Sequence, residues 1–450
     1  MKKCHRVIAI VAAVLLLGSC SENAGTDSGS GVPQKSGSAY SDSSTAETAD
    51  FSETAKSLSL NMAEGDFSET VGLFSENLSA QLDEDSLKNA WDSTVSVIGD
   101  FAEISEVQEE QSGDNIVVTA VLRYTDKGLK VSFTFNSDGK IDGIWLNYCA
   151  LPENGDTYTE QAIKIGEYEL DGLLTLPNDT AEPPVVILIQ GSGQTDMNET
   201  IGENVPFEDI AHGLADNGIA VIRFNKRFYQ FPELADDTIT VWSEVIDDVS
   251  AAVEYAENIC GRDGEIIIVG HSLGGMLAPE ICKENPDVDA MISLAGSPRH
   301  LADIIYDQSE ASLRSAELTE EEISAQLDVL KTEIEKIKSV TENDTEEYLG
   351  VNAGYWKSLG DIDAVKTAES LDIPMLFLQG GDDFQVYAHK DFELWQEYLS
   401  GKDNCTFKLY DGLNHLFMKS GGKTDSSEYD VKGSVSEEVI DDISEWINSL

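Results

Sequence analysis

Positive charge is what this sequence lacks most. Its 84 Asp and Glu face 29 Lys and Arg, which gives a formal net charge of −55 at pH 7. Because such a chain is repelled by the phosphate backbones of DNA and RNA, nucleic-acid binding is disfavoured. We interpret the excess of acidic residues as a source of solubility and of spacing at a cell surface, in preference to a site for a specific cationic partner.

Cysteine is also scarce, with six in 450 residues. Beyond residue 20 only Cys149, Cys260, Cys282 and Cys405 remain. They have neither the spacing of a metal site nor the density of a disulfide scaffold, so the sequence predicts no metal. It assigns no disulfide pairing, and we interpret Cys260 and Cys282 as reduced core residues.

Long apolar runs are confined to the N-terminus, and no later segment has the length and apolarity of a transmembrane helix. Three basic residues precede the run Val7–Leu17, and Gly18–Cys20 follows it, a pattern that predicts an export signal. Leu17–Cys20 resembles the bacterial lipobox, whose Cys is diacylated and becomes the N-terminus after cleavage. The resemblance implies that residues 1–20 are a lipoprotein signal peptide and that Cys20 anchors the exported protein to the outer face of the bacterial cell membrane. The alternative is an ordinary secretory signal with an unrelated Cys at its end.

Two segments precede the main body of the chain. Residues 21–50 are Ser, Thr, Gly, Ala and acidic residues with almost nothing apolar, which predicts a disordered linker. Residues 51–150 begin with helical spacing and continue with strand patterns at 115–124, 129–141 and 142–148, as in a small α+β domain. This block resembles the nuclear-transport-factor-2-like modules of unknown function that precede hydrolase domains in some bacterial envelope proteins. We expect a binding or spacing role for it and no chemistry.

From about residue 155 to 450, continuous apolar strands alternate with amphipathic helices. After a hairpin at 162–177, strands are predicted at 185–190, 219–224, 265–270, 288–296, 373–380 and 405–410. Helices are predicted at 207–217, 242–259, 276–284 and 389–400. Strands of this kind require a sheet covered on both faces, so we predict an α/β fold with a doubly wound, mostly parallel sheet.

One interval, at about 300–371, breaks this alternation. Its apolar residues repeat at three and four positions and mark one face of a helix: Ile323, Leu327, Leu330, Ile334 and Ile337. A helical insertion here must sit above the edge of the sheet. We favour a lid over a site at the carboxyl ends of the strands, and the alternative is a surface decoration.

Gly270–Gly274 matches Gly-X-Ser-X-Gly, the nucleophile elbow, in which Ser272 is the nucleophile. The pattern is short and occurs by chance, but its context is informative. An apolar strand precedes it, a predicted helix follows it, and glycines on either side let the two backbones approach closely.

A Ser hydroxyl needs a base to take its proton and a carboxylate to orient that base. Of the histidines after Ser272, His300 precedes any acid-bearing strand and His389 lies too near the acid loop. His415 follows the last strand, in a loop that can reach the elbow, and is predicted to be the base. Asp382 and Asp383 both follow the strand 373–380.

The loop that holds Asp382 and Asp383 has the spacing Gly-X-X-Asp-X-X-Val, which resembles the acid loop of many α/β hydrolases. This resemblance selects Asp383, and Asp382 is interpreted as a turn or solvent-facing residue. Two backbone N–H groups are needed to stabilise the oxyanion. We predict Leu273 and Ser192 as their sources, with Gly193 an alternative to Ser192. Many relatives have His-Gly where this chain has Gln190-Gly191.

Six segments together resemble the bacterial esterase and serine-aminopeptidase-like group of α/β-hydrolase-fold serine hydrolases: Gly191–Asp196, Arg223–Arg227, Gly270–Pro279, Leu294–Arg299, Leu378–Val386 and Leu413–Met418. The resemblance implies hydrolysis of a small-molecule carboxylic ester through an acyl-enzyme, with no metal or organic cofactor. Peptidase or acyltransferase activity on the same triad is the alternative, as is a surface binding protein without catalysis. Lys226 and Arg227 are interpreted either as ligands of an anionic substrate group or as members of structural ion pairs.

Overall fold

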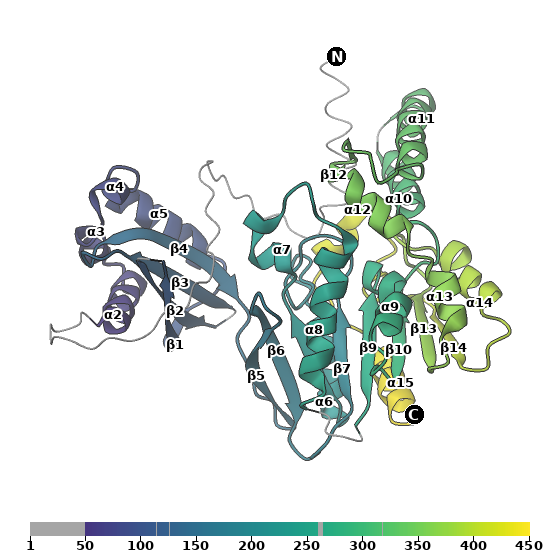
Figure 1. The fold of residues 1–450 in the computed structure, drawn as a ribbon, viewed down its shortest axis with the longest axis horizontal. Coiled ribbons are helices and arrows are strands. Elements are labelled where there is room, and N and C mark those ends of the chain that lie inside the picture. The colour runs from purple at the N-terminus through teal and green to yellow at the C-terminus, as the bar shows by residue number, and fades with distance from the viewer. Residues whose placement is uncertain (1–49, 114, 126, 260–263, 317) are drawn as a thin grey trace. The chain divides into compact units, whose positions relative to one another are not determined.

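The computed structural model describes residues 50–113, 115–125, 127–259, 264–316 and 318–450 (Figure 1). The described residues fall into two compact units that divide between Leu151 and Pro152. Cys20 with the predicted signal peptide, nearly all of the predicted linker, and Cys260 lie outside the described residues. Within the described part of the chain, no helix has the length and apolarity needed to cross a membrane.

In the described part of residues 50–151, helices precede an antiparallel sheet of order β1-β2-β3-β4. The elements are α2 (Phe51–Ala63), α3 (Ser68–Gly72), α4 (Glu76–Ser79), α5 (Glu84–Val95), β1 (Phe101–Ser112), β2 (Asn115–Tyr124), β3 (Gly128–Phe135) and β4 (Ile141–Cys149). Leu58 and Met62 of α2 share one buried cluster with Val118 and Phe133 of the sheet. The predicted α+β organisation of this unit is therefore present.

Strand β1 was not predicted from the sequence. All of its side chains are exposed or half-buried, so it lacks the alternation of polar and apolar residues that reveals a strand. Its pairing with β2 also shifts register between Phe101 and Glu103 and between Ile104 and Glu106. Each bulge shifts the period-2 pattern by one residue, which hides the strand in the sequence.

Residues 152–450 are built on a sheet of order β14-β13-β10-β9-β7-β8-β6-β5. The strands are β5 (Tyr158–Ile165), β6 (Leu170–Pro177), β7 (Val185–Ile189), β8 (Ala220–Phe224), β9 (Ile266–His271), β10 (Ala290–Leu294), β13 (Met375–Gly380) and β14 (Cys405–Tyr410). The hairpin β5–β6 joins antiparallel to β8, and every other neighbouring pair is parallel. The predicted doubly wound, mostly parallel sheet is confirmed.

Helices cover both faces of this sheet (Figure 1). The helices outside the insertion are α6 (Pro206–Asp216), α7 (Arg227–Gln230), α8 (Asp247–Ala256), α9 (Leu273–Glu284), α14 (Glu393–Tyr398) and α15 (Glu437–Ile447). The π-helical turns η2 (Trp242–Ile246) and η3 (Ala388–Phe392) precede α8 and α14, and η1 (Pro232–Leu234) and η4 (Ser426–Asp430) are short 3₁₀ turns. Ile187 and Ile189 of β7 join a core with α8 and α9. Val186 and Leu188 join a second core with α6 and α15. Successive residues of one strand thus feed opposite layers.

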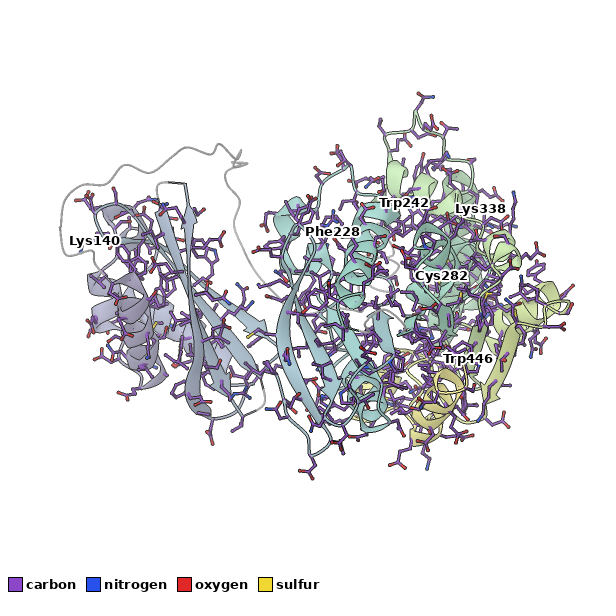
Figure 2. All side chains as sticks on the ribbon, turned by 60° about the horizontal axis from the view of Figure 1, so that its bottom comes forward. Lys140, Phe228, Trp242, Cys282, Lys338 and Trp446 are labelled. Atoms are coloured by element: carbon purple, nitrogen blue, oxygen red, sulfur yellow. The ribbon has the colours of Figure 1, made fainter. Side chains whose placement is uncertain are left out.

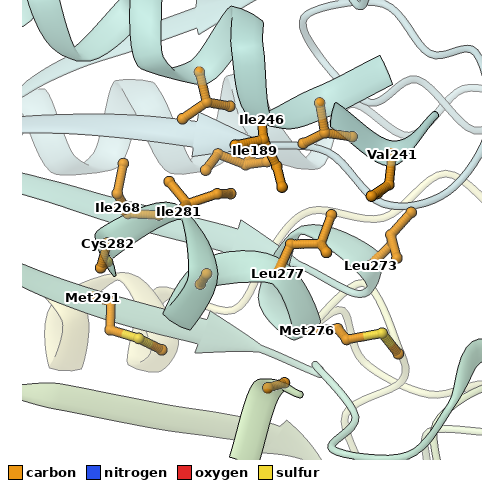
Figure 3. Packing of buried hydrophobic residues seen from close by; sticks show 14 of the residues in the cluster. Ile189, Val241, Ile246, Ile268, Leu273, Met276, Leu277, Ile281, Cys282 and Met291 are labelled. Atoms are coloured by element: carbon orange, nitrogen blue, oxygen red, sulfur yellow. The ribbon is translucent and has the colours of Figure 1, made fainter. Parts of the chain in front are cut away.

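The core around α9 fixes the start of that helix. Leu273, Leu277 and Ile281 all point into the cluster that also contains Ile189 and Ile268 of the sheet (Figure 3). The next residue of α9, Cys282, is a buried free cysteine among the densely packed side chains of this unit, as predicted (Figure 2).

The predicted insertion lies between β10 and β13. It contains α10 (Leu301–Ser315), α11 (Glu320–Ile337), α12 (Ala353–Gly360), α13 (Ala364–Ser370) and the short pair β11 (Glu347–Tyr348) and β12 (Val351–Asn352). The five apolar residues predicted to share a helix face all lie on α11 and are all buried. That prediction is confirmed.

A buried ion pair ties the hairpin to the rest of the sheet. Glu160 Oε1 on β5 lies 2.7 Å from Arg223 Nη1 on β8, and it also contacts Thr175 Oγ1 and His212 Nε2 at 2.9 and 3.0 Å. Burial on its own raises the pKa of Glu160. The contact with His212 and the charge and hydrogen bond of Arg223 outweigh burial and lower the pKa to about 2.

The change Glu160→Gln should destabilise the protein by about 3–5 kcal/mol at neutral pH, because it removes the counter-charge in direct contact with the buried Arg223 and leaves only Glu208, 3.9 Å away. The Glu160 contribution is full above the ordinary pKa of 4.5 and is lost as the pH falls towards 2. Urea unfolding followed by tryptophan fluorescence should therefore give a larger difference between wild type and variant at pH 7 than at pH 3.

Lys164→Gln on the same strand is the matched control. It removes the ion pair between Lys164 and Asp171, in which the Lys side chain is 45% exposed, so its cost should stay within about 0.5 kcal/mol. Equal losses in the two variants would contradict the importance of the buried pair.

Candidate active site

Ser272 occupies the tight turn between β9 and α9. Its backbone has φ 54° and ψ −112°, a region that costs energy for a residue with a side chain. The Ser272 N–H donates to the carbonyl of Leu294 at 2.8 Å, which holds the turn against the neighbouring strand β10. This strained corner between strand and helix is the local geometry of a nucleophile elbow.

Glycines around Ser272 make the turn possible. A Cβ on Gly270 would lie 2.2 Å from the carbonyl oxygen of Gly274, and one on Gly274 would lie 2.3 Å from that of Ile189. Both distances are far shorter than a van der Waals contact, so a side chain at either position would push strand and helix apart. Helix α9 begins directly after Ser272, earlier than the predicted start at residue 276, because Gly274 and Gly275 are already helical.

His415 and Asp383 lie together next to the elbow. His415 Nδ1 is 2.6 Å from Asp383 Oδ2, and both side chains are buried. Asp382, the other carboxylate of this loop, is exposed. The structure thus brings Asp383, and not its neighbour, to the imidazole.

Asp383 is held by more than His415. Its Oδ1 accepts the N–H groups of Gln385 and Val386 at 2.7 and 2.9 Å, and its Oδ2 also accepts Gln379 Nε2 at 2.9 Å. Both oxygens are therefore fixed, which orients the carboxylate toward the imidazole. Gln379 was not predicted, because nothing in an apolar strand marks one Gln as a partner of a later loop.

A pocket of about 120 Å³ lies at the elbow. Ser272 and His415 both line it, and among the described residues no hydrogen bond joins their side chains. Gln308 and Ser312 of α10 line it too, so the predicted lid contributes to its wall. Tyr429, whose hydroxyl lies 2.5 Å from Gln385 Nε2, adds a further wall that the sequence did not reveal.

The loop after β7 adjoins the nucleophile. A Cβ on Gly191 would lie 3.1 Å from Ser272 Cβ. Ser192 lines the pocket, whereas Gly193 is not among its lining residues. Within the described part of the chain, the N–H groups of Ser192 and Leu273 have no protein acceptor. Both groups are thus available to donate to a ligand.

Glu199 and His271 form a buried pair beside this loop that sequence patterns missed. His271 Nδ1 lies 2.9 Å from Glu199 Oε2, and Glu199 Oε1 accepts the N–H of Gly191 at 2.6 Å. Burial lowers the pKa of His271, but the charge of Glu199 and the contact of His271 Nε2 with the His415 carbonyl outweigh it and raise the pKa above its ordinary value. No motif spacing marks Glu199; its backbone, with φ 51°, is unusual only in the structure.

Lys226 and Arg227 both take part in ion pairs. Lys226 Nζ lies 3.2 Å from Glu244 Oε1, and Arg227 Nη2 lies 2.6 Å from Asp248 Oδ1. Neither residue is among those that line the pocket. These contacts agree with the interpretation of Lys226 and Arg227 as members of structural ion pairs.

No group of three or more His, Cys, Asp or Glu side chains suited to a metal ion occurs among the described residues. Cys282 and Cys405 are free cysteines. Ser272 contributes a hydroxyl and His415 an imidazole to the pocket, and Asp383 contacts that imidazole.

Comparison with protein families gives a match in each unit. Residues 55–144 match a family described as protein of unknown function (DUF3887). Residues 197–420 match the family described as serine aminopeptidase, S33. The second match spans the elbow and the loops that carry Asp383 and His415.

Two solved esterase structures are similar at low sequence identity. Esterase Pf2001 of Pyrococcus furiosus is 15% identical, with a TM-score of 0.40 over 65% of this chain and 90% of that one. Est1E from Butyrivibrio proteoclasticus is 17% identical, with a TM-score of 0.40 over 64% of this chain and 96% of that one.

A closer sequence match comes from a curated enzyme. Esterase EstD of Thermotoga maritima is 34% identical to this chain over 390 residues, which cover 85% of this chain and 91% of EstD. A match of this identity over nearly the whole relative establishes common family membership. The chain belongs to the family of α/β-hydrolase esterases that includes EstD.

Proposed function

We propose that Ser272, His415 and Asp383 form a catalytic triad that hydrolyses carboxylic esters through an acyl-enzyme. The main support is the 2.6 Å contact between His415 Nδ1 and Asp383 Oδ2, next to a strained Ser272 that lines the same pocket as His415. With Nδ1 engaged by Asp383, Nε2 is the ring nitrogen that remains for proton exchange.

In this mechanism the Ser272 hydroxyl attacks the ester carbonyl while His415 accepts its proton. Asp383 keeps the imidazole in the required tautomer and stabilises the imidazolium. The N–H groups of Leu273 and Ser192 donate to the oxyanion of the tetrahedral intermediate. His415 then protonates the leaving alcohol, and water, activated by the same imidazole, releases the acid from Ser272. No step requires a metal or an organic cofactor.

The pocket volume of about 120 Å³ suits a short acyl group, so small-molecule esters are the proposed substrates. Peptidase activity on the same triad is the second candidate, because the match of residues 197–420 is to a family described as a serine aminopeptidase. Assays with p-nitrophenyl acyl esters and with aminoacyl p-nitroanilides separate the two. Acyl transfer to an alcohol would appear as ester exchange. A surface binding role without turnover would appear as the absence of both hydrolytic activities.

Ser272→Ala should abolish labelling by a fluorophosphonate probe and hydrolysis of p-nitrophenyl acetate, because the probe reacts only with an activated hydroxyl. Besides Ser192, whose N–H is assigned to the oxyanion, Ser312 and Ser426 line the pocket and are rival nucleophiles. Labelling should persist in Ser312→Ala and in Ser426→Ala. A Ser272→Ala protein that still labels would assign the nucleophile to another serine.

Asp383→Asn should lower kcat by about a thousandfold or more, because an amide no longer holds His415 in the required tautomer or stabilises its cation. The matched control is Asp382→Asn, which alters an exposed carboxylate one residue away and should retain nearly wild-type kcat. The measurement is steady-state hydrolysis of p-nitrophenyl acetate by both variants. Comparable losses in both would point to a general electrostatic effect of the loop.

We also propose that the protein is exported and anchored to the outer face of the bacterial cell membrane through lipid on Cys20. Metabolic labelling with a fatty-acid analogue should therefore disappear in Cys20→Ala, since the lipobox Cys is the acylated residue. Cys4→Ala is the matched control, because Cys4 lies in the segment removed with the signal peptide, and its labelling should match wild type. Labelling retained in Cys20→Ala would exclude this anchor.

A further inference from the structure

Lys226 makes a contact that its ion pair does not explain. Its side chain is only 3% exposed, and Nζ lies 2.5 Å from the carbonyl oxygen of Gly191 as well as 3.2 Å from Glu244 Oε1. A buried ammonium group costs free energy unless its donors are used, so this contact is part of what allows Lys226 to be buried.

The Gly191 carbonyl belongs to the same peptide group as the N–H of Ser192. In a planar trans peptide the C=O and N–H bonds point in opposite directions. A cation that holds the carbonyl on one side therefore fixes the direction of the N–H on the other. Ser192 lines the pocket, and its N–H has no protein acceptor within the described residues.

We propose that Lys226 is a positioning residue for ester hydrolysis, which orients and polarises the Gly191–Ser192 peptide so that the Ser192 N–H donates more strongly to the oxyanion. The inference rests on the proposed function, since it requires Ser192 to face the reacting carbonyl. A positive charge on a peptide oxygen draws electron density from the N–H, and in a site with little water this effect is weakly screened.

The other side of Gly191 is held by a negative charge. Glu199 Oε1 accepts the Gly191 N–H at 2.6 Å, and Glu199 is in turn paired with His271. Gly191 thus lies between a cation on its carbonyl and an anion on its N–H. This arrangement opposes a flip of either adjoining peptide, which would reverse the dipole against both charges.

The insertion helps to keep Lys226 in place. Glu244 Oε1 pairs with Lys226, while Glu244 Oε2 accepts the hydroxyl of Tyr355 on α12 at 2.6 Å. Tyr355 is buried, so this hydroxyl gives the carboxylate a fixed partner without competing for the ammonium group. Lys226 is therefore held by Glu244, which Tyr355 of the insertion fixes, while it contacts the Gly191 carbonyl in the loop after β7.

The test compares wild type with Lys226→Met, which removes the charge and the donor, in hydrolysis of p-nitrophenyl acetate and in inhibition by n-propylboronic acid. The Ser272 oxygen bonds to boron as His415 accepts the hydroxyl proton, which gives a tetrahedral boronate with one oxygen where the oxyanion forms. We expect kcat and boronate affinity to fall together by about tenfold or more, with KM within about twofold of wild type. A rise in KM alone, or unchanged kcat and boronate affinity, would overturn the inference.

Two further variants keep the result interpretable. Lys226→Gln retains polarity without charge and should show the same parallel loss, so the test stands if Lys226→Met does not fold. Arg227→Met removes the neighbouring buried ion pair with Asp248 and should leave kcat and boronate affinity near wild type.

Equal losses in Arg227→Met and the Lys226 variants would reduce Lys226 to a structural role and overturn the inference. Failure of the proposed function is distinguished by wild type itself, which would then neither label with fluorophosphonate nor hydrolyse the ester.

Discussion

The backbone strain at Ser272 is the constraint around which the catalytic unit is arranged. A left-handed φ at a residue with a side chain persists only where the surroundings fix it. Here the N–H of Ser272 is bonded to the strand β10, and Gly270 and Gly274 allow the helix to start against the sheet with no Cβ between the backbones. Buried side chains of α9 then lock the helix onto the core. The packing of the sheet and of α9 therefore fixes the position of the Ser272 hydroxyl.

The loops around Ser272 hold its partners by polar contacts whose members come from distant parts of the chain. Asp383 is fixed by Gln379 and by two backbone N–H groups before it meets His415. The loop at Gly191 is held by Glu199 from a later turn. Hydrogen bonds are stronger where little water enters, so these contacts hold Asp383 and Gly191 in fixed orientations. The pocket is thus bordered by loops held through polar contacts and by Gln308 and Ser312 of α10 in the insertion.

Sequence patterns reveal the parts of this protein whose signal is local. The period of apolar residues predicts the parallel strands, the hairpin and the buried face of α11, because each follows from which face of one element is buried. The elbow and the order of the loops predicted Ser272 and His415, and the resemblance of one loop to the acid loop of α/β hydrolases selected Asp383. Glu199 and Gln379 escaped prediction because their roles depend on contacts between separate elements, and in a chain with 84 carboxylates nothing local distinguishes one Glu. β1 escaped for the opposite reason, since its bulges destroy the local period itself.

Two imidazoles lie side by side at the elbow, with ring centroids 4.6 Å apart, and their surroundings separate their roles. His271 Nδ1 lies 2.9 Å from Glu199 Oε2 and its Nε2 lies 3.0 Å from the His415 carbonyl, and its raised pKa favours the cation. His415 has one nitrogen on Asp383 and a ring that lines the pocket. The carboxylates nearest the elbow are therefore each matched by a fixed partner, Asp383 by His415 and Glu199 by His271. Although the chain as a whole is strongly acidic, each of these two buried carboxylates therefore faces an imidazole.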